Sequence, residues 1–329
     1  MPELPEVETI RRGLEKTIIG KKIADVDVRL PKIVSIGPAV VSNIRKSSLA
    51  KVKTFKKLLI GQKILNVGRR AKMLMIDVSP ASPKTASRGG GPSFSILVHL
   101  KMTGQLVFSK KGEKKVMKIL NIANGRLEPL PHKYTHVIFG FSDGSRLYYN
   151  DMRQFGYLRV VTDRELLHVR ELLEYGPEPR LAGLYPRSAR EPDIPFLTLE
   201  HLITKAKTRP KLSVKQFLMD PKVVAGIGNI YSDEILYWAK IRPARSLRSL
   251  DRADFKGIYR AISKVLAEAI KAQGSSVGDF FKVDGSEGGY GLVHMVYGRY
   301  VQLCKKCGTI IKSVKLGGRT GSYCPVCQK

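Results

Sequence analysis

MPELPEVETIRRGLE, residues 1–15, opens the chain with an amphipathic pattern. Apolar side chains recur there and just beyond at helical spacing: Leu4, Val7, Ile10, Leu14 and Ile18. This period predicts a helix over residues 3–19 with one apolar face to bury. Prolines are tolerated in a first turn, and glutamates there suit the positive end of the helix dipole. One interpretation is therefore an ordinary, well-capped helix.

The same stretch also supports a chemical interpretation. Met1 precedes a small residue and would normally be removed, which leaves Pro2 with a free secondary amine beside the carboxylates of Glu3 and Glu6. A neutral amine attacks an electrophilic carbon to give an iminium, and carboxylates can shuttle protons around it. An α-amino group titrates near ~8, so an appreciable fraction is nucleophilic at neutral pH. The residues alone leave both interpretations open.

The chain is strongly basic. It carries 58 Lys and Arg against 28 Asp and Glu, a net charge of +30, which predicts a polyanionic partner, above all nucleic acid. At 329 residues and 43% hydrophobic, it can bury sizeable cores in two or three domains. No apolar run reaches the roughly 18 residues of a membrane span, and no export signal is present. We therefore expect a cytoplasmic protein, nucleoid-associated in a prokaryote, that binds no membrane.

Four cysteines stand in two CxxC pairs within CKKCGTIIKSVKLGGRTGSYCPVC, residues 304–327. They are Cys304, Cys307, Cys324 and Cys327. This spacing is typical of a structural zinc site, in which four thiolates close a tetrahedron around one ion. The intervening residues predict a hairpin that turns at Gly317 and Gly318. A redox-active pair of CxxC motifs is disfavoured, because no thioredoxin-like βαβ pattern surrounds them.

Residues 20–160 predict an all-β domain. Its strand-like runs are KMLMIDV (72–78), FSILVHL (94–100) and THVIFGFSDGSRLYY (135–149), the last with a hairpin signal at Asp143-Gly144. Residues 79–93 and 109–130 are expected to be long surface loops.

The pattern changes after a proline-rich segment. Residues 176–197 hold five of the 18 prolines, which predicts a linker. Helical spacing follows, with Thr198 and Asp251 as expected N-caps. Between these helices, the glycines of GIGNIYSDE (226–234) permit a tight turn, and Asn229 is a candidate cap for a helix whose N–H groups suit a phosphate. A plain helix–helix turn would contain the same residues.

Seven motifs occur in the order found in formamidopyrimidine-DNA glycosylases, a family that the chain resembles from end to end. They are MPELPEVET at the start, GRRAK (68–72), HLKMTG (99–104), RQFG (153–156), GIGNIYSDE (226–234), VYGR (296–299) and the terminal cysteine pairs. Related endonuclease VIII enzymes typically begin MPEGPE, so Leu4 favours the purine-repair branch.

The resemblance implies an α+β multidomain fold and a reaction. The fold has an N-terminal β-sandwich with an N-terminal helix, a helix-two-turn-helix domain and a C-terminal β-hairpin zinc finger. The reaction excises oxidised purines such as 8-oxoguanine and formamidopyrimidines, and then cuts the strand by β,δ-elimination. Pro2 matches the amine that attacks C1′, and Glu3 the carboxylate that helps open the sugar ring. Glu6 matches a supporting helix carboxylate, and Lys72 the lysine that contacts phosphate near the lesion.

The resemblance also implies a set of DNA contacts. Asn229 and Arg319 match residues that grip the backbone flanking the extruded nucleotide. Met102, Arg153 and Phe155 match residues that fill the vacated space and probe the opposite strand, and a thioether, a planar cation and an aromatic wedge suit that task. Without the family, these side chains would be solvated charges and core residues.

The chain departs from the family pattern in places. Gln154 and Met152 replace an arginine and a proline, Lys101 stands where glycine is usual, and Tyr134 replaces a histidine. These changes leave the catalytic residues intact but put opposite-base selectivity in doubt. Two alternatives stay open: a glycosylase for oxidised pyrimidines of the endonuclease VIII type, and a catalytically silent protein that binds damaged DNA.

The expected organisation has four parts. Residues 1–175 form the catalytic helix and β-sandwich, 176–197 the linker, 198–293 the helix-two-turn-helix domain and 294–329 the zinc finger. We expect a monomer that binds damaged double-stranded DNA and one structural Zn²⁺.

Overall fold

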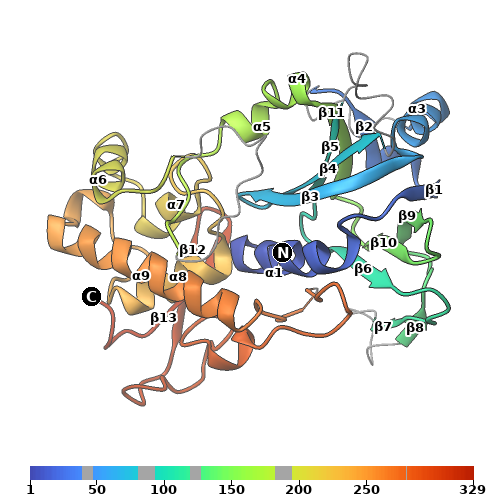
Figure 1. Ribbon diagram of the computed structural model, residues 1–329. Helices are drawn as coiled ribbons and strands as arrows, with labels where there is room; N and C mark the ends of the chain where they lie inside the picture. The colour runs from blue at the N-terminus through green and yellow to red at the C-terminus, as the bar shows by residue number, and fades with distance from the viewer. Residues whose placement is uncertain (39–46, 81–92, 119–126, 182–194, 279) are drawn as a thin grey trace.

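The computed structural model describes residues 1–38, 47–80, 93–118, 127–181, 195–278 and 280–329 (Figure 1). A β-rich half and a helical half lie on either side of the N-terminal helix in that view. Within the described ranges, no helix has both the length and the apolar character that a bilayer crossing needs.

The N-terminal half is a sandwich of two sheets, as predicted. One sheet has the strand order β1 (Ile23–Val28), β9 (Thr135–Phe141), β10 (Arg146–Asp151), β6 (Gly104–Ser109). The other has the order β2 (Val34–Ile36), β11 (Tyr157–Thr162), β5 (Phe94–His99), β4 (Met73–Pro80), β3 (Gln62–Arg70). All neighbouring strands are antiparallel except β2 and β11. The hairpin predicted at Asp143-Gly144 is confirmed, because β9 and β10 flank it.

Two predictions for this half were wrong in detail. The region is not purely β, because helix α3 (Leu49–Leu59) covers part of the sandwich and buries Val52, Phe55 and Leu59 at helical spacing. Residues 109–130 are not one loop, because β7 (Val116–Lys118) pairs with β8 (Leu127–Pro129). Residues 81–92 and 119–126, the central parts of the expected loops, lie outside the described residues.

Three short helices complete the sandwich half, and the last two lead into the helical half. They are η1 (Pro31–Ile33), before β2, and α4 (Asp163–Leu166) and α5 (Arg170–Leu173), after β11. The helical half contains α6 (Leu199–Lys207), α7 (Val214–Met219), α8 (Asn229–Trp238), η3 (Leu247–Ser249), α9 (Arg252–Lys271) and η4 (Tyr290–Val293). Thr198 and Asp251 cap α6 and α9, as predicted. Most of the expected linker, residues 182–194, lies outside the described residues.

Helix α1 (Leu4–Ile18) joins the two halves. Leu4 belongs to the core of the helical half, whereas Val7, Ile10, Leu14 and Ile18 belong to the sandwich core. All five side chains are at most 1% exposed. The apolar face read from the sequence is therefore divided between two cores, and the first turn of α1 lies at their junction (Figure 1).

The C-terminal residues form the predicted hairpin. Strands β12 (Lys312–Leu316) and β13 (Arg319–Tyr323) pair across the turn at Gly317 and Gly318. A small core that includes Cys304 and Cys324 packs against Tyr237 near the end of α8. This packing fixes the hairpin to the helical half.

Candidate active site and nucleic-acid interface

Glu3 lies at the start of α1 and caps a different helix. Its carboxylate accepts hydrogen bonds from the backbone N–H groups of Gly228 (2.6 Å), Ile230 (2.8 Å) and Tyr231 (3.4 Å) at the beginning of α8. These donors have no intrahelical partner, and the dipole of α8 also favours a negative charge there. The side chain of Glu3 is only 1% exposed. A carboxylate next to Pro2 is thus held rigidly by the helical half.

Glu6 lies one turn further along α1 and is equally buried. It accepts hydrogen bonds from the Glu3 N–H (2.8 Å), the Ser275 N–H (2.8 Å) and the Tyr231 hydroxyl (2.5 Å). Burial, together with the charge of Glu3, raises the pKa of Glu6 to about 7. At neutral pH, therefore, this carboxyl group can either donate or accept a proton.

Lys72 reaches the same point from the β3–β4 turn. Its Nζ donates to the Ile227 carbonyl at 2.9 Å. A Cβ built on Gly228 would lie 2.5 Å from the Glu3 carboxyl carbon and 2.8 Å from Lys72 Nζ, so a side chain there would displace both groups. Burial lowers the pKa of Lys72, and the nearby charge of Arg319 adds to this effect, while Glu3 opposes it. The structure therefore brings Glu3, Glu6 and Lys72 together beside Pro2.

A buried ionic network positions the Lys72 turn. Glu178 accepts from Arg69 Nη2 (3.1 Å), Arg70 Nη1 (3.1 Å) and the Ala71 N–H (2.5 Å), and Arg69 also pairs with Glu8 of α1 (3.1 Å). Glu178 is fully buried and lies in the segment predicted to be a linker. The sequence interpretation missed its role, although two adjacent arginines in GRRAK were a signal that acidic partners were needed.

The three residues expected to fill the space of an extruded base lie on two neighbouring turns. Met102 is on the β5–β6 turn, and Arg153 and Phe155 are on the β10–β11 turn. The Arg153 N–H donates to Thr103 Oγ1 at 2.9 Å, which joins the turns. The Arg153 guanidinium lies 4.9 Å from the centre of the Phe155 ring, and Phe155 is 41% exposed. The two side chains therefore form an exposed cation–π pair.

Two departures from the family pattern lie on these turns at left-handed backbone positions. Lys101 has φ +50° and Gln154 has φ +55°. Glycine adopts this conformation without strain, which explains why it is usual at the first position. Next to Lys101, burial holds the pKa of His99 well below its usual range, and the charges of Lys101 and Lys72 contribute. The two turns thus adjoin the Lys72 cluster.

Asn229 does not cap α8, contrary to the sequence-based expectation. It is the first helical residue, and Gly228 at the N-cap offers no side chain. The helix terminus expected to suit a phosphate is instead occupied by the carboxylate of Glu3. The Asn229 side chain bonds to Tyr297, while its buried Oδ1 has no hydrogen-bond partner within the described chain. Arg319 is exposed at the start of β13, close enough to Lys72 for its charge to act there.

The position of the hairpin relative to α8 depends on a buried ion pair that the sequence interpretation missed. Lys215 Nζ contacts Asp233 Oδ1 at 2.6 Å, and both side chains are completely buried. Asp233 Oδ2 accepts from the Ser322 N–H of β13 at 2.8 Å. The neighbouring Glu234 accepts from three consecutive backbone N–H groups, residues 295–297, each at 2.9 Å. The acidic pair that ends GIGNIYSDE therefore anchors the C-terminal segment.

The four cysteines converge as predicted. Their Sγ atoms all lie within 4.8 Å of one another, with Cys304 to Cys327 at 3.9 Å and Cys307 to Cys324 at 3.5 Å. A tetrahedron with Zn–S bonds of about 2.3 Å has S–S edges of roughly 3.8 Å. None of the four forms a disulfide. The group fits one structural zinc ion with no open coordination position.

Models of known protein families match most of the chain. The formamidopyrimidine-DNA glycosylase N-terminal domain matches residues 1–158, and the formamidopyrimidine-DNA glycosylase H2TH domain matches residues 189–280. A zinc finger found in FPG and IleRS matches residues 302–329.

Full-length relatives agree with these matches. The formamidopyrimidine-DNA glycosylase of Pelotomaculum thermopropionicum is 36% identical over 329 residues, which cover all of this chain and 99% of the relative. A Lactococcus lactis Fpg bound to DNA containing an abasic site has a TM-score of 0.76 and 28% identity, with 99% of both chains covered. The same Lactococcus lactis protein bound to DNA containing an oxidised pyrimidine has a TM-score of 0.75 and 29% identity, with both chains fully covered.

Proposed function

The chain belongs to the formamidopyrimidine-DNA glycosylase family of base-excision repair enzymes, and we propose that it excises oxidised purines from duplex DNA and then cleaves the abasic strand. The observation that carries this proposal is the convergence of Glu3, Glu6 and Lys72 beside Pro2. One site then holds a nucleophile, two carboxylates and a phosphate-binding cation.

The first proposed step replaces the damaged base by the enzyme. With Met1 removed, the Pro2 amine attacks C1′ and the bond from C1′ to the base breaks. The departing base takes up a proton from water, and the amine gives its own proton to Glu3. A proton transferred by Glu3 to the ring oxygen of the sugar opens the ring and completes the iminium. Because Glu3 is held by three N–H groups of α8, it keeps its position through this change.

The second step cuts the strand. The iminium acidifies C2′, so loss of a proton there expels the 3′ phosphate, and a further elimination expels the 5′ phosphate. Glu6, whose pKa lies at about 7, supports proton exchange in the site. Lys72 places a cation where the flanking phosphate would lie, and Arg319 and Asn229 would grip the same strand.

A base must leave the helix for Pro2 to reach C1′. We propose that Met102, Arg153 and Phe155 occupy the resulting space, because they lie on two joined turns next to the Lys72 cluster. The strong positive charge of the chain would supply the salt-dependent part of DNA affinity. The partner is damaged double-stranded DNA, and the protein acts as a monomer with one structural zinc.

Oxidised pyrimidines are the second candidate substrates. The Lactococcus lactis relative bound to DNA containing an oxidised pyrimidine is the observation that favours them. Parallel excision assays on 8-oxoguanine, formamidopyrimidine and oxidised-pyrimidine duplexes separate the two candidates.

Borohydride trapping on an 8-oxoguanine duplex tests the mechanism, because it reduces the iminium to a stable covalent adduct. In protein that keeps Met1, the Pro2 nitrogen is an amide whose lone pair is delocalised. Such protein should fold and bind the duplex but should form no adduct, whereas processed protein should be trapped at Pro2. Adduct formation by the unprocessed protein would move the nucleophile to a lysine, and Lys72→Ala would be the next variant to examine.

A further inference from the structure

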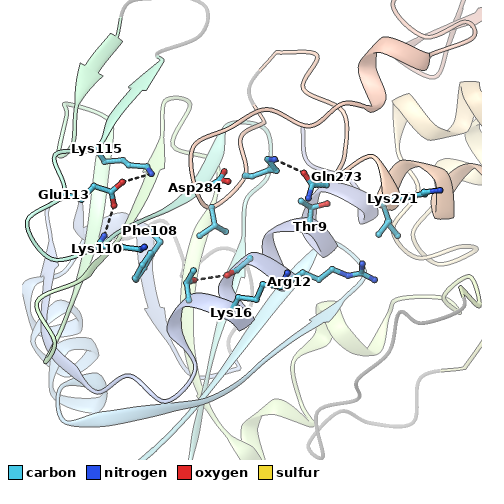
Figure 2. A pocket seen from close by; sticks show the side chains of 15 residues that line it. Thr9, Arg12, Lys16, Phe108, Lys110, Glu113, Lys115, Lys271, Gln273 and Asp284 are labelled. Carbon is cyan, nitrogen blue, oxygen red and sulfur yellow. Dashed lines mark hydrogen bonds and ion pairs between the residues drawn. The ribbon is translucent and has the colours of Figure 1, made fainter.

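A hollow lies beside α1 (Figure 2). It has a volume of about 630 Å³, which is the size of a small-ligand site. Its walls are α1, the end of β6 with the segment that follows it, and residues 270–273 and 282–284 at and beyond the end of α9. None of the proposed catalytic or DNA-contacting residues lines it.

The walls of this hollow are strongly basic. Six cations line it: Arg12, Lys16, Lys110, Lys115, Lys271 and Lys282. Two carboxylates oppose them, and both already have partners. Glu113 contacts Lys115 Nζ (3.0 Å) and the Lys110 N–H (2.9 Å), and Asp284 accepts from the Ser286 N–H (2.9 Å). The hollow therefore has a clear excess of positive charge.

Three of the lysines are available to a ligand. Among the residues that the structure describes, the Nζ atoms of Lys16, Lys110 and Lys271 make no hydrogen bond or ion pair. They come from three different walls, and Figure 2 shows Lys110 and Lys271 on opposite sides of the hollow. Unpaired ammonium groups around one hollow make its potential positive, and a multivalent anion would be attracted there.

Part of the lining of the hollow is apolar. Phe108, Val283 and Ile270 contribute to it. Val283 packs closely on α1, because a Cβ on Gly13 would lie 3.0 Å from a Val283 methyl group. The Val283 carbonyl accepts from the Phe108 N–H at 2.8 Å, which ties two walls together. A flat ring could rest against these side chains while its charged part meets the lysines.

We propose that the hollow binds a phosphorylated small molecule of about nucleotide size, with its phosphates on the three lysines and its ring against Phe108 and Val283. A duplex is the less suitable occupant, because its backbone is a convex rod and these cations line a concavity bounded by three chain segments. The site is independent of the repair activity proposed above.

Isothermal titration of the full-length, zinc-loaded protein with ADP tests the proposal, with adenosine and pyrophosphate as the two part-ligands. ADP should bind at one site per chain. Adenosine should bind at least about tenfold more weakly, because it lacks the charge-assisted hydrogen bonds. The affinity for pyrophosphate should lie between the affinities for ADP and adenosine, because pyrophosphate lacks the ring contact. Absence of ADP binding at millimolar concentration would overturn the proposal.

Paired variants locate the site. The double variant Lys16→Glu, Lys271→Glu should bind ADP about tenfold or more weakly. Lys53→Glu with Lys256→Glu, on the exposed faces of α3 and α9, changes the net charge equally and should have little effect. Both double variants should fold and should cleave damaged DNA equally well. Equal loss of ADP binding in both, or a selective loss of DNA affinity in the first, would contradict a small-molecule site.

Discussion

Helices α8 and α9 begin in opposite ways. At α9, Asp251 accepts from the Asp254 N–H at 2.7 Å and Asp254 accepts from the Asp251 N–H at 3.3 Å, so the cap is complete within four residues. At α8, Gly228 offers no side chain, and the free N–H groups donate to Glu3, which is more than 220 residues away in sequence.

The difference shows that capping the N-terminus of a helix can have more than one structural effect. Both caps satisfy orphan N–H groups. The local cap stabilises one helix, whereas the distant cap also fixes a proposed catalytic carboxylate relative to the helix-two-turn-helix motif. Changes at α8 should therefore affect catalysis and the joining of the two halves, while matched changes at α9 should affect local stability alone.

The largest contrast is expected from Glu3→Gln and Asp251→Asn, which convert a capping carboxylate to an amide at each helix. Excision of 8-oxoguanine by Glu3→Gln should fall by about 10²–10⁴-fold, the usual contribution of general acid–base catalysis. Asp251→Asn should keep full activity, because asparagine is an equally good cap. Single-turnover kinetics measure both variants. Similar rates for the two would mean that Glu3 is only a structural cap.

The second contrast compares the ion pair in the first turns of α8 with the ion pair in the first turn of α9. Lys215→Met leaves Asp233 buried without its cation and should lower the free energy of unfolding by about 3–5 kcal/mol. Arg245→Met breaks the partly exposed pair of Arg245 and Asp254. This change should lower the free energy of unfolding by about 1 kcal/mol or less. Urea denaturation gives both values. Equal losses would show that the Lys215 pair does not hold α8 and the hairpin together.

The third prediction concerns pH. The pKa of Glu6 is raised from 4.5 to about 7 in the folded protein. At pH values between these two, the folded state therefore holds a proton that the unfolded state has lost. The stability contributed by the protonated carboxyl is fully present at low pH and is lost as pH rises toward about 7. Glu6→Gln should remove this part of the pH dependence. An unchanged difference between pH 5 and pH 8 in urea denaturation would contradict it.

A small effect is expected at the local cap. Asp251→Ala removes one hydrogen bond from the start of α9 and should lower the free energy of unfolding by about 1 kcal/mol. Thermal denaturation measures the loss, and excision activity at a permissive temperature should be unchanged. A loss of activity here would remove the distinction between the two helices.

Local patterns predicted much of the fold. The period of α1, the Asp143-Gly144 hairpin, the caps at Thr198 and Asp251 and the cysteine spacing each depend on residues that are close in sequence. Helix α3 was missed because its many lysines leave only three buried apolar positions to reveal the period. The expectation that Asn229 caps α8 was wrong because the cap comes from another domain.

The sequence by itself determined which chemical groups are present and which short segments they occupy: an amine after Met1, two carboxylates one turn apart, GRRAK, and four zinc-binding thiols. The tertiary structure alone decided that Glu3 meets α8, that Glu178 meets Arg69 and Arg70, and that Lys215 meets Asp233. Hydrophobic period and capping act over a few residues and leave a mark in the sequence. A buried charge, in contrast, needs only a partner nearby in space, and the packing of the two cores around α1 chooses that partner.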